Sequence, residues 1–231
     1  MTSINIYEVG PRDGLQNLEH IVPTEIKLLL IDTLQQAGLQ NIEVTSFAHP
    51  KLLPQMADAE KVFQGQGSAL IMNSKGMQRA LDAGVTHFNI VYSPSEEFNR
   101  RNLGCDLNTA IARYMKMLEG FPKNNVRVYI SCFFGCPYEG TISESKLERA
   151  ITTAKLFGNT VVLCDTVGVA NISDIESAAA MALRHNIKVA LHLHHKKDRL
   201  MHALSLVRTA IDNGISEFDS SIGGLGGCPF I

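Results

Sequence analysis

Residues 126–165 read VRVYISCFFGCPYEGTISESKLERAITTAKLFGNTVVLCD, and this stretch decides the fold. It begins with a β-branched run, Val126–Cys132, and ends with a second one, Thr160–Asp165. Between them, apolar residues recur at helical spacing over Ser143–Phe157, and Gly158 follows in the position of a helix cap. A strand, a helix and a second strand of these lengths predict one βαβ unit of a parallel sheet.

The same alternation extends along the whole chain. Eight short runs have the composition of strands: Ile4–Val9, Asn41–Ser46, Ser68–Asn73, His87–Tyr92, Val126–Cys132, Thr160–Asp165, Ile187–His192 and Ile215–Ser220. Six segments between them have helical periodicity: Thr24–Ala37, Lys75–Ala83, Leu107–Leu118, Ser143–Phe157, Ser173–Arg184 and Leu200–Asp212. Glycine caps are expected after four of these helices, at Gly38, Gly84, Gly158 and Gly214. The pattern predicts an α/β protein with a (β/α)8 TIM barrel, because an open doubly wound sheet more often has five or six strands.

The composition narrows the class of protein. The chain has 231 residues, of which 45% are hydrophobic, so we expect a single TIM-barrel domain over residues 1–231. The net charge is −2, without runs of like charge, and we therefore expect no nucleic-acid partner. The N-terminus has no signal-peptide pattern, and no apolar run reaches the ~18 residues of a membrane span. These features predict a cytoplasmic protein with no membrane partner.

The cysteines predict no disulfide framework, because there are five of them in a chain of this length. Cys132 and Cys136 are spaced like a metal-binding pair, but no second pair lies at zinc-finger spacing. We therefore expect ordinary thiols at Cys105, Cys132, Cys136 and Cys164.

The end of the chain is unusual for a barrel. Eleven residues follow Ser220, the end of the eighth expected strand, and these are too few for a closing helix. We expect either a chain truncated at its C-terminus or a partner that covers the eighth and first strands.

Candidate functional residues follow the expected strands, where the active sites of barrels lie. A turn after the first strand presents Arg12, which can bind a carboxylate or a developing enolate, beside Asp13, which can ligate a divalent cation. An exposed ion pair is the alternative interpretation of this turn. His192 and His194 lie on one face of the seventh strand, a spacing that favours a metal site. Glu43 lies within an apolar strand and needs a partner there, for which Arg12 is the candidate.

The last segment, Gly223–Phe230, reads GGLGGCPF and places Cys228 in a glycine-rich turn. Its glycines give access to positive φ and allow close approach to a ligand, and Pro229 restricts the direction in which the chain leaves. The segment is either a terminal tail or a loop that carries Cys228 to a ligand.

Several of these segments together carry a resemblance to a known family. They are Glu8–Asn17, residues 45–58, Gly135–Gly140, Asp165–Gly168, the pair His192 and His194, and Gly223–Phe230. In this order and spacing they resemble the 3-hydroxy-3-methylglutaryl-CoA lyases, which are metal-dependent TIM-barrel enzymes related to isopropylmalate and homocitrate synthases. The resemblance implies cleavage of an acyl-CoA substrate, 3-hydroxy-3-methylglutaryl-CoA, to acetyl-CoA and acetoacetate. It also implies a homodimer that acts in ketone-body and leucine metabolism.

The resemblance further implies a role for each candidate residue. The implied ligands of Mg²⁺ or Mn²⁺ are Asp13, His192 and His194. The implied catalytic residues are Cys228, Arg12, Glu43 and Asp165. The implied substrate-binding residues are Gln16, Asn73 and Tyr138. In the implied reaction, Arg12, braced by Glu43, stabilises the enolate, and Cys228 protonates the carbanion of acetyl-CoA. Asp165, His192 or a water molecule takes part in removing the hydroxyl proton.

Two departures from the family pattern are expected to affect the site. After the histidine pair the family usually continues with Asp-Thr, whereas this chain has His195–Arg199, which we expect to be a solvated basic turn. The family's fourth metal ligand is an asparagine beyond the cysteine loop, and the sequence ends at Ile231 before that position. Two alternatives therefore remain open, a related acetyl-CoA-condensing synthase and a catalytically impaired CoA-binding paralogue.

Overall fold

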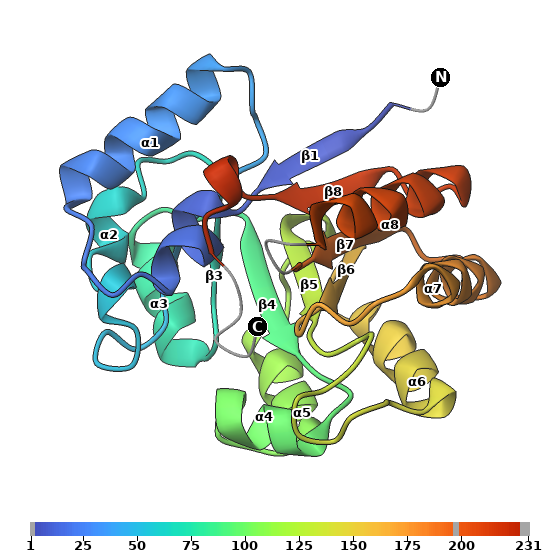
Figure 1. Ribbon diagram of the computed structural model, residues 1–231. Coiled ribbons are helices and arrows are strands. Elements are labelled where there is room, and N and C mark those ends of the chain that lie inside the picture. The colour runs from blue at the N-terminus through green and yellow to red at the C-terminus, as the bar shows by residue number, and fades with distance from the viewer. Residues whose placement is uncertain (1–2, 196–198, 227–231) are drawn as a thin grey trace. The chain divides into compact units, whose positions relative to one another are not determined.

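The computed structural model describes residues 3–195 and 199–226, which form two compact units (Figure 1). One unit contains the described part of Val91–Phe218 together with residues 3–5. The other contains Ile6–Ile90 together with residues 219–226. The expectation of a single domain stays a prediction.

The eight expected strands are all present among the described residues. They are β1 (Asn5–Glu8), β2 (Glu43–Ser46), β3 (Ser68–Leu70), β4 (Phe88–Tyr92), β5 (Val126–Ile130), β6 (Thr160–Asp165), β7 (Val189–Leu193) and β8 (Glu217–Ser220). They form one sheet in the order β1-β8-β7-β6-β5-β4-β3-β2, and the strand pairs described in it are parallel. A parallel bridge between Glu8 and Ile42 joins the two ends of this order. The predicted (β/α)8 TIM barrel is therefore confirmed.

The six expected helices are also present, and two short helices were not expected. The helices are α1 (Thr24–Gln36), α2 (Ala59–Val62), α3 (Ser74–Asp82), α4 (Glu96–Leu103), α5 (Leu107–Met117), α6 (Glu144–Ala154), α7 (Ile172–Arg184) and α8 (Leu200–Asp212). The four residues of α2 are too few to show helical periodicity. The segment of α4 is mostly polar and lacks an apolar pattern, and this helix begins at the side-chain cap of Ser95 and ends at the left-handed Gly104.

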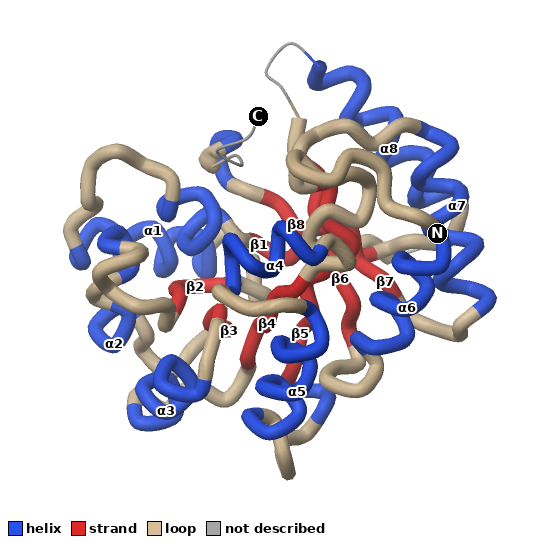
Figure 2. The backbone as a smooth tube through the Cα atoms, turned by 90° about the horizontal axis from the view of Figure 1, so that it is seen from below, coloured by secondary structure: helices blue, strands red, loops and turns tan. Residues whose placement is uncertain are grey.

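Burial explains why the strands look apolar in the sequence. All residues of β4 and β5 are buried, as expected for a parallel sheet with both faces covered. In the unit that contains β5 to β7, the helices α6, α7 and α8 lie on the outer side of these strands (Figure 2). Among the described residues, no helix combines the length and the apolar character needed to cross a membrane.

The glycines after the helices have two different functions. Gly38, Gly84 and Gly214 have φ values of 94°, 85° and 87°, which confirms them as left-handed caps. Gly158 does not have a positive φ, so its expected cap conformation is wrong. A Cβ atom at Gly158 would lie 2.2 Å from the carbonyl oxygen of Val126, so glycine is needed here for close packing at the start of β5.

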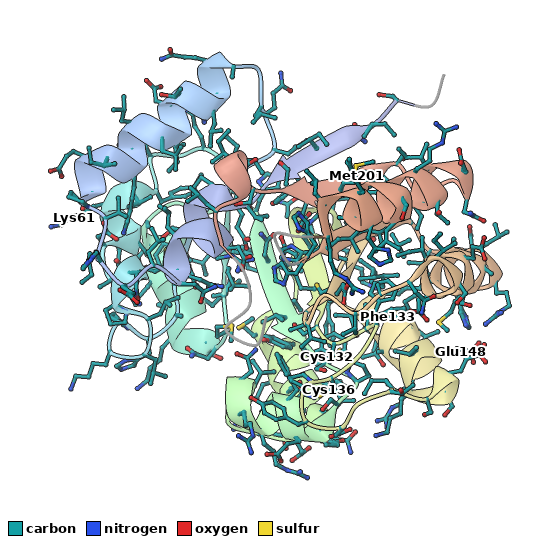
Figure 3. All side chains as sticks on the ribbon, viewed as in Figure 1. Lys61, Cys132, Phe133, Cys136, Glu148 and Met201 are labelled. Carbon is teal, nitrogen blue, oxygen red and sulfur yellow. The ribbon has the colours of Figure 1, made fainter. Side chains whose placement is uncertain are left out.

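The four cysteines of the described residues are free thiols, as expected. Cys132 and Cys136 lie in the loop after β5, where they form an apolar cluster with Phe98 and Ile142 (Figure 3). Burial raises the pKa of Cys132, so this thiol stays protonated at neutral pH.

Candidate active site

The turn after β1 is a single π-helical turn, η1 (Gly10–Gly14). The backbone N–H groups of Arg12 and Asp13 both donate to the carbonyl oxygen of Val9, over 3.1 and 2.6 Å. A Cβ atom at Gly10 would lie 2.5 Å from a carboxylate oxygen of Glu8, so a larger residue at the start of this turn would displace the Glu8 side chain. Single π-helical turns often occur at functional sites. This one presents two consecutive charged side chains.

Arg12 and Asp13 are buried, with exposed fractions of 6% and 8%. The alternative of an exposed ion pair is therefore wrong. Arg12 Nε donates to Glu43 Oε2 over 2.6 Å, and Arg12 Nη1 donates to Asp13 Oδ1 over 2.6 Å. The predicted pairing of Glu43 with Arg12 is present, and the guanidinium group links two carboxylates.

Glu43 is completely buried. Burial raises the pKa of its carboxyl group, whereas the charge of Arg12 and the hydrogen bonds from Asn89 and Arg12 act in the opposite direction. A buried carboxylate without these partners would cost several kcal/mol, on the order of 3–5. The orientation of Arg12 and the ionisation of Glu43 therefore depend on each other.

Gln16, an expected substrate-binding residue, lies next to this cluster. Its Nε2 donates to Asp13 Oδ1 over 2.8 Å, so Asp13 Oδ1 accepts from both Gln16 and Arg12. These donors orient the carboxylate of Asp13, as groups around a metal ligand commonly do.

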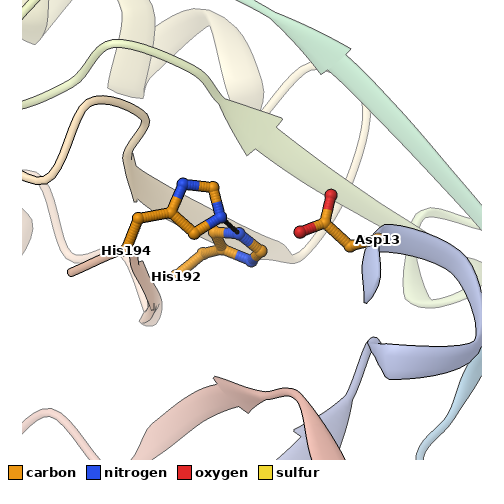
Figure 4. A group of neighbouring side chains, drawn as sticks. All are labelled: Asp13, His192 and His194. Carbon is orange, nitrogen blue, oxygen red and sulfur yellow. Dashed lines mark hydrogen bonds between the residues drawn. The ribbon is translucent and has the colours of Figure 1, made fainter. Parts of the chain in front are cut away.

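The histidine pair lies at the end of β7. His192 Nε2 and His194 Nε2 share a hydrogen bond of 2.9 Å, and the ring centroids are 4.7 Å apart (Figure 4). Two ligands at right angles on a divalent cation, each at about 2.1 Å, are about 3 Å apart. The two nitrogen atoms therefore have the separation that a shared cation requires, so the pair fits a metal site. His194 Nδ1 also lies 3.4 Å from the carbonyl oxygen of Thr166, a contact that orients its ring.

The basic turn after the pair is described only in part. His195 and Arg199 are exposed, as expected for a solvated turn. Lys196 and Lys197 lie outside the described residues.

Asp165, an expected catalytic residue, is buried at the end of β6. Its two carboxylate oxygens accept hydrogen bonds from the backbone N–H groups of Val169 and Ala170, each over 3.0 Å. Burial raises the pKa of Asp165, and these two hydrogen bonds oppose that effect. The visible role of Asp165 is to hold the loop between β6 and α7, and its catalytic role stays a prediction.

Asn73 and Tyr138, the other expected substrate-binding residues, have contacts of a structural kind. Asn73 is the N-cap of α3, and its side chain accepts a hydrogen bond from Gly76 N over 3.0 Å. The Tyr138 ring lies 6.3 Å from that of Phe98, and Arg101 lies over it at 4.3 Å. Their roles in substrate binding also stay predictions.

Cys228 lies outside the described residues, but the loop that leads to it is described up to Gly226. Gly226 has a φ of 102°, and a Cβ atom there would lie 3.0 Å from Gly14 Cα. The carboxylate of Glu8 accepts hydrogen bonds from Gly10 N and Ile222 N, over 2.8 and 2.9 Å. The start of the glycine-rich loop is thus packed against the turn that carries Arg12 and Asp13.

Sequence reasoning missed Glu8 and Asn89 as parts of the site. Glu8 is the first residue of the Glu8–Asn17 motif, and its side chain joins η1 to the loop after β8. Asn89 donates to Glu43 Oε1 over 2.7 Å. The available signal was its amide at the second position of FNIVY, the otherwise apolar sequence of β4.

Comparisons with known proteins identify the family of this chain. Residues 3–228 match the family described as HMGL-like. The chain is 40% identical to the mitochondrial hydroxymethylglutaryl-CoA lyase of Bos taurus, over 98% of this chain and 73% of that protein. It is 37% identical to the cytoplasmic 3-hydroxy-3-methylglutaryl-CoA lyase of Rattus norvegicus, over 98% of this chain and 69% of that protein. Its structure resembles an HMG-CoA lyase from Acenitobacter baumannii in complex with coenzyme A and 3-methylmalate, with a TM-score of 0.91 and 34% identity, over 99% of this chain and 77% of that one. The chain therefore belongs to the HMGL-like family.

Proposed function

We propose that this protein is a divalent-metal-dependent lyase that cleaves 3-hydroxy-3-methylglutaryl-CoA to acetyl-CoA and acetoacetate. The buried arrangement of Arg12 between Glu43 and Asp13 carries this proposal. Relatives that are 40% and 37% identical to this chain over the aligned residues have that lyase name, and a similar structure holds coenzyme A. An oriented cation in a buried site suits a reaction in which negative charge develops on a thioester oxygen.

The proposed metal ligands are Asp13, His192 and His194. Each offers one ligand atom, either a carboxylate oxygen or an imidazole nitrogen (Figure 4). This donor set suits Mg²⁺ or Mn²⁺, and we expect either ion to support activity. When bound, such an ion acidifies the hydroxyl group of the substrate.

The reaction breaks the bond between C2 and C3 of the acyl chain. The hydroxyl group on C3 loses its proton and becomes the ketone of acetoacetate, while the electron pair of the broken bond passes to C2. Arg12 stabilises the resulting enolate of acetyl-CoA, and Glu43 holds Arg12 in position. Cys228 then donates a proton to C2, which completes acetyl-CoA.

We assign removal of the hydroxyl proton to a water molecule, because a His192 ring that binds the cation through Nε2 carries its proton on Nδ1 and cannot also act as the base. Asp165 is a weaker candidate, because both of its oxygens already hold the loop after β6. The packing of Gly226 against η1 supports the role of Cys228, which follows two residues later.

The test is an assay of the purified protein with 3-hydroxy-3-methylglutaryl-CoA and Mn²⁺, in which acetoacetate and acetyl-CoA are both measured. Equal amounts of the two products, formed only when the metal is present, are the expected result. Condensation of acetyl-CoA with a 2-oxo acid, without cleavage of the lyase substrate, would instead establish the related synthase. Tight CoA binding without either reaction would establish the impaired paralogue.

The expected homodimer and the expected cytoplasmic location stay predictions. The relatives include both a mitochondrial and a cytoplasmic form, so their names do not select one compartment. The pathway of ketone-body formation and leucine breakdown follows only if the proposed activity is found.

A further inference from the structure

A layer of polar side chains connects four neighbouring strands and contacts Arg12 through Glu43. Its members are Tyr7 on β1, Glu43 on β2, Ser68 on β3 and Asn89 on β4. Glu43, Ser68 and Asn89 are all buried, with exposed fractions of 0%, 3% and 1%. The interior positions of TIM barrels are dominated by branched apolar residues, so a polar layer here requires an explanation.

The members of this polar layer are hydrogen-bonded to one another. Asn89 Nδ2 donates to Glu43 Oε1 over 2.7 Å and to Ser68 Oγ over 3.0 Å. The Tyr7 hydroxyl group forms a hydrogen bond with Ser68 Oγ and lies 3.5 Å from Asn89 Oδ1. The chain of contacts therefore runs from Tyr7 through Ser68 and Asn89 to Glu43.

The two oxygens of Glu43 face different partners. Oε2 accepts from Arg12, and Oε1 accepts from Asn89. Donors on both oxygens prevent the carboxylate from rotating about its χ3 angle, which is otherwise a soft torsion. They also stabilise its charged form in a site that excludes water.

We propose that Asn89 is a positioning residue, supported by Ser68 and Tyr7, which fixes the carboxylate of Glu43 and thereby the guanidinium group of Arg12 for the reaction. This inference rests on the proposed lyase function, because it assigns Asn89 a role at the same site. The amide suits this role because it donates to Glu43 while its oxygen can accept from Tyr7.

The first test is Asn89→Ser, which removes the amide donor without adding charge or bulk. We expect kcat to fall about 10- to 100-fold, as for other groups that orient a reacting residue, with KM changed less than about threefold. The affinity for Mn²⁺, measured by calorimetry, is expected to stay within about threefold, because Asn89 is not a proposed ligand.

The second measurement reports on Arg12 itself. In protein labelled with ¹⁵N-arginine, the Nε–H signal of Arg12 is assigned by its loss in Arg12→Lys. Its hydrogen exchange is expected to become about tenfold faster in Asn89→Ser, which corresponds to the loss of one charge-assisted hydrogen bond. A role in folding alone would lower the stability and leave this signal and kcat unchanged.

The matched control is Asn99→Ser. Asn99 is equally buried, and its amide bonds only to the backbone of Ser93 in the contacts described. This variant should lose stability and keep the wild-type kcat. If Asn89→Ser does not fold, Asn89→Leu, which is close in size and also lacks the amide donor, replaces it in both measurements, with the same expected results.

A kcat of the Asn89 variant within about twofold of wild type would overturn the proposal, since the expected loss is at least about tenfold. Failure of the proposed lyase function gives a different result, because the wild-type protein itself would then form no products. In that case the exchange rate decides alone: a faster exchange supports the positioning of Arg12, and an unchanged rate overturns it.

Discussion

At the scale of single residues, Arg12 shows how strongly a role depends on geometry. Its Nε and Nη1 atoms donate to carboxylates on two different segments, Glu43 on β2 and Asp13 on η1. The planar, forked guanidinium group holds these two donors at fixed angles, whereas the ammonium group of lysine is a compact charge on a flexible stem. The side chain is thus held by its shape as well as by its charge.

Arg12→Lys should therefore lower kcat by about 100- to 1000-fold, which is the usual effect of losing an oriented donor at a developing oxyanion. Steady-state kinetics of the lyase reaction measures this. Arg208→Lys makes the same change at an exposed ion pair of α8 and should leave kcat unchanged. Near-wild-type turnover in Arg12→Lys would remove Arg12 from the mechanism.

His194→Ala should weaken Mn²⁺ binding by more than about 100-fold, because a direct ligand contributes more than the groups around it. Isothermal titration calorimetry measures the affinity. His195→Ala is the matched control, since this neighbour is exposed and is not a proposed ligand. Equal affinities in the two variants would exclude His194 from the ligand set.

At the scale of elements, the contact between α1 and α2 depends on a buried charge. Lys27 on α1 is 2% exposed, and its Nζ donates to Asp58 Oδ1 over 2.6 Å and to the carbonyl oxygen of Gln55. Desolvation opposes ionisation of Asp58, but the hydrogen bonds from Lys27 and Thr24 and the charge of Lys27 together lower its pKa. The charged form of Asp58 therefore stabilises the folded protein.

Asp58→Asn should lower the free energy of unfolding at pH 7 by about 1–3 kcal/mol, because it weakens the pairing of a buried ammonium group. The stabilisation exists above the unfolded pKa of Asp58, near 3.8, and is lost as the pH falls through the lowered folded pKa. The difference between wild type and variant should therefore shrink below about pH 4. Urea unfolding at several pH values measures it.

Asp212→Asn is the control for this pH dependence. Asp212 pairs with Arg208 on the exposed surface of α8, so the substitution should cost less than about 0.5 kcal/mol. A difference for Asp58→Asn that stays constant from pH 7 to below pH 4 would contradict the assigned role of its charge.

Gly158 packs closely against the backbone at the start of β5. Gly158→Ala should lower the free energy of unfolding by about 3 kcal/mol, because its Cβ would collide with the Val126 carbonyl oxygen at the start of β5. Gly84→Ala, at a left-handed cap with open space around it, should cost about 1 kcal/mol. Chemical unfolding compares the two variants, and equal losses would show that the collision is relieved.

At the scale of the whole molecule, the proposed metal ligands are far apart in sequence. Asp13 follows β1, whereas His192 and His194 belong to the end of β7. Such a ligand set exists only in the folded chain, so metal binding and folding are thermodynamically linked.

Mn²⁺ at about 100 times its dissociation constant should therefore stabilise the fold by about 2.7 kcal/mol. Thermal unfolding with Mn²⁺ and with a chelator measures the difference in Tm. His194→Ala should show almost no such difference. A metal-dependent shift of equal size in this variant would place the ion elsewhere.

The architecture of the molecule was predictable because it follows from local patterns. Apolar runs of strand length alternate with helical periodicity, and this alternation predicted all eight strands and six helices. The helices α2 and α4 were not predictable in this way, because one has four residues and the other is mostly polar. At Gly158 the residue type was informative, but packing rather than backbone conformation explains it.

The sequence by itself determined the barrel, the family and the candidate residues, because residue type, spacing and order along the chain carry that information. It also indicated the pairing of Glu43 with Arg12, since a carboxylate in an apolar strand needs a cation. Only the tertiary structure decided that Arg12 and Asp13 are buried and that Asn89 holds the second oxygen of Glu43. The physical reason is that hydrogen bonds and burial depend on distances between segments far apart in the chain, and no local pattern records those distances.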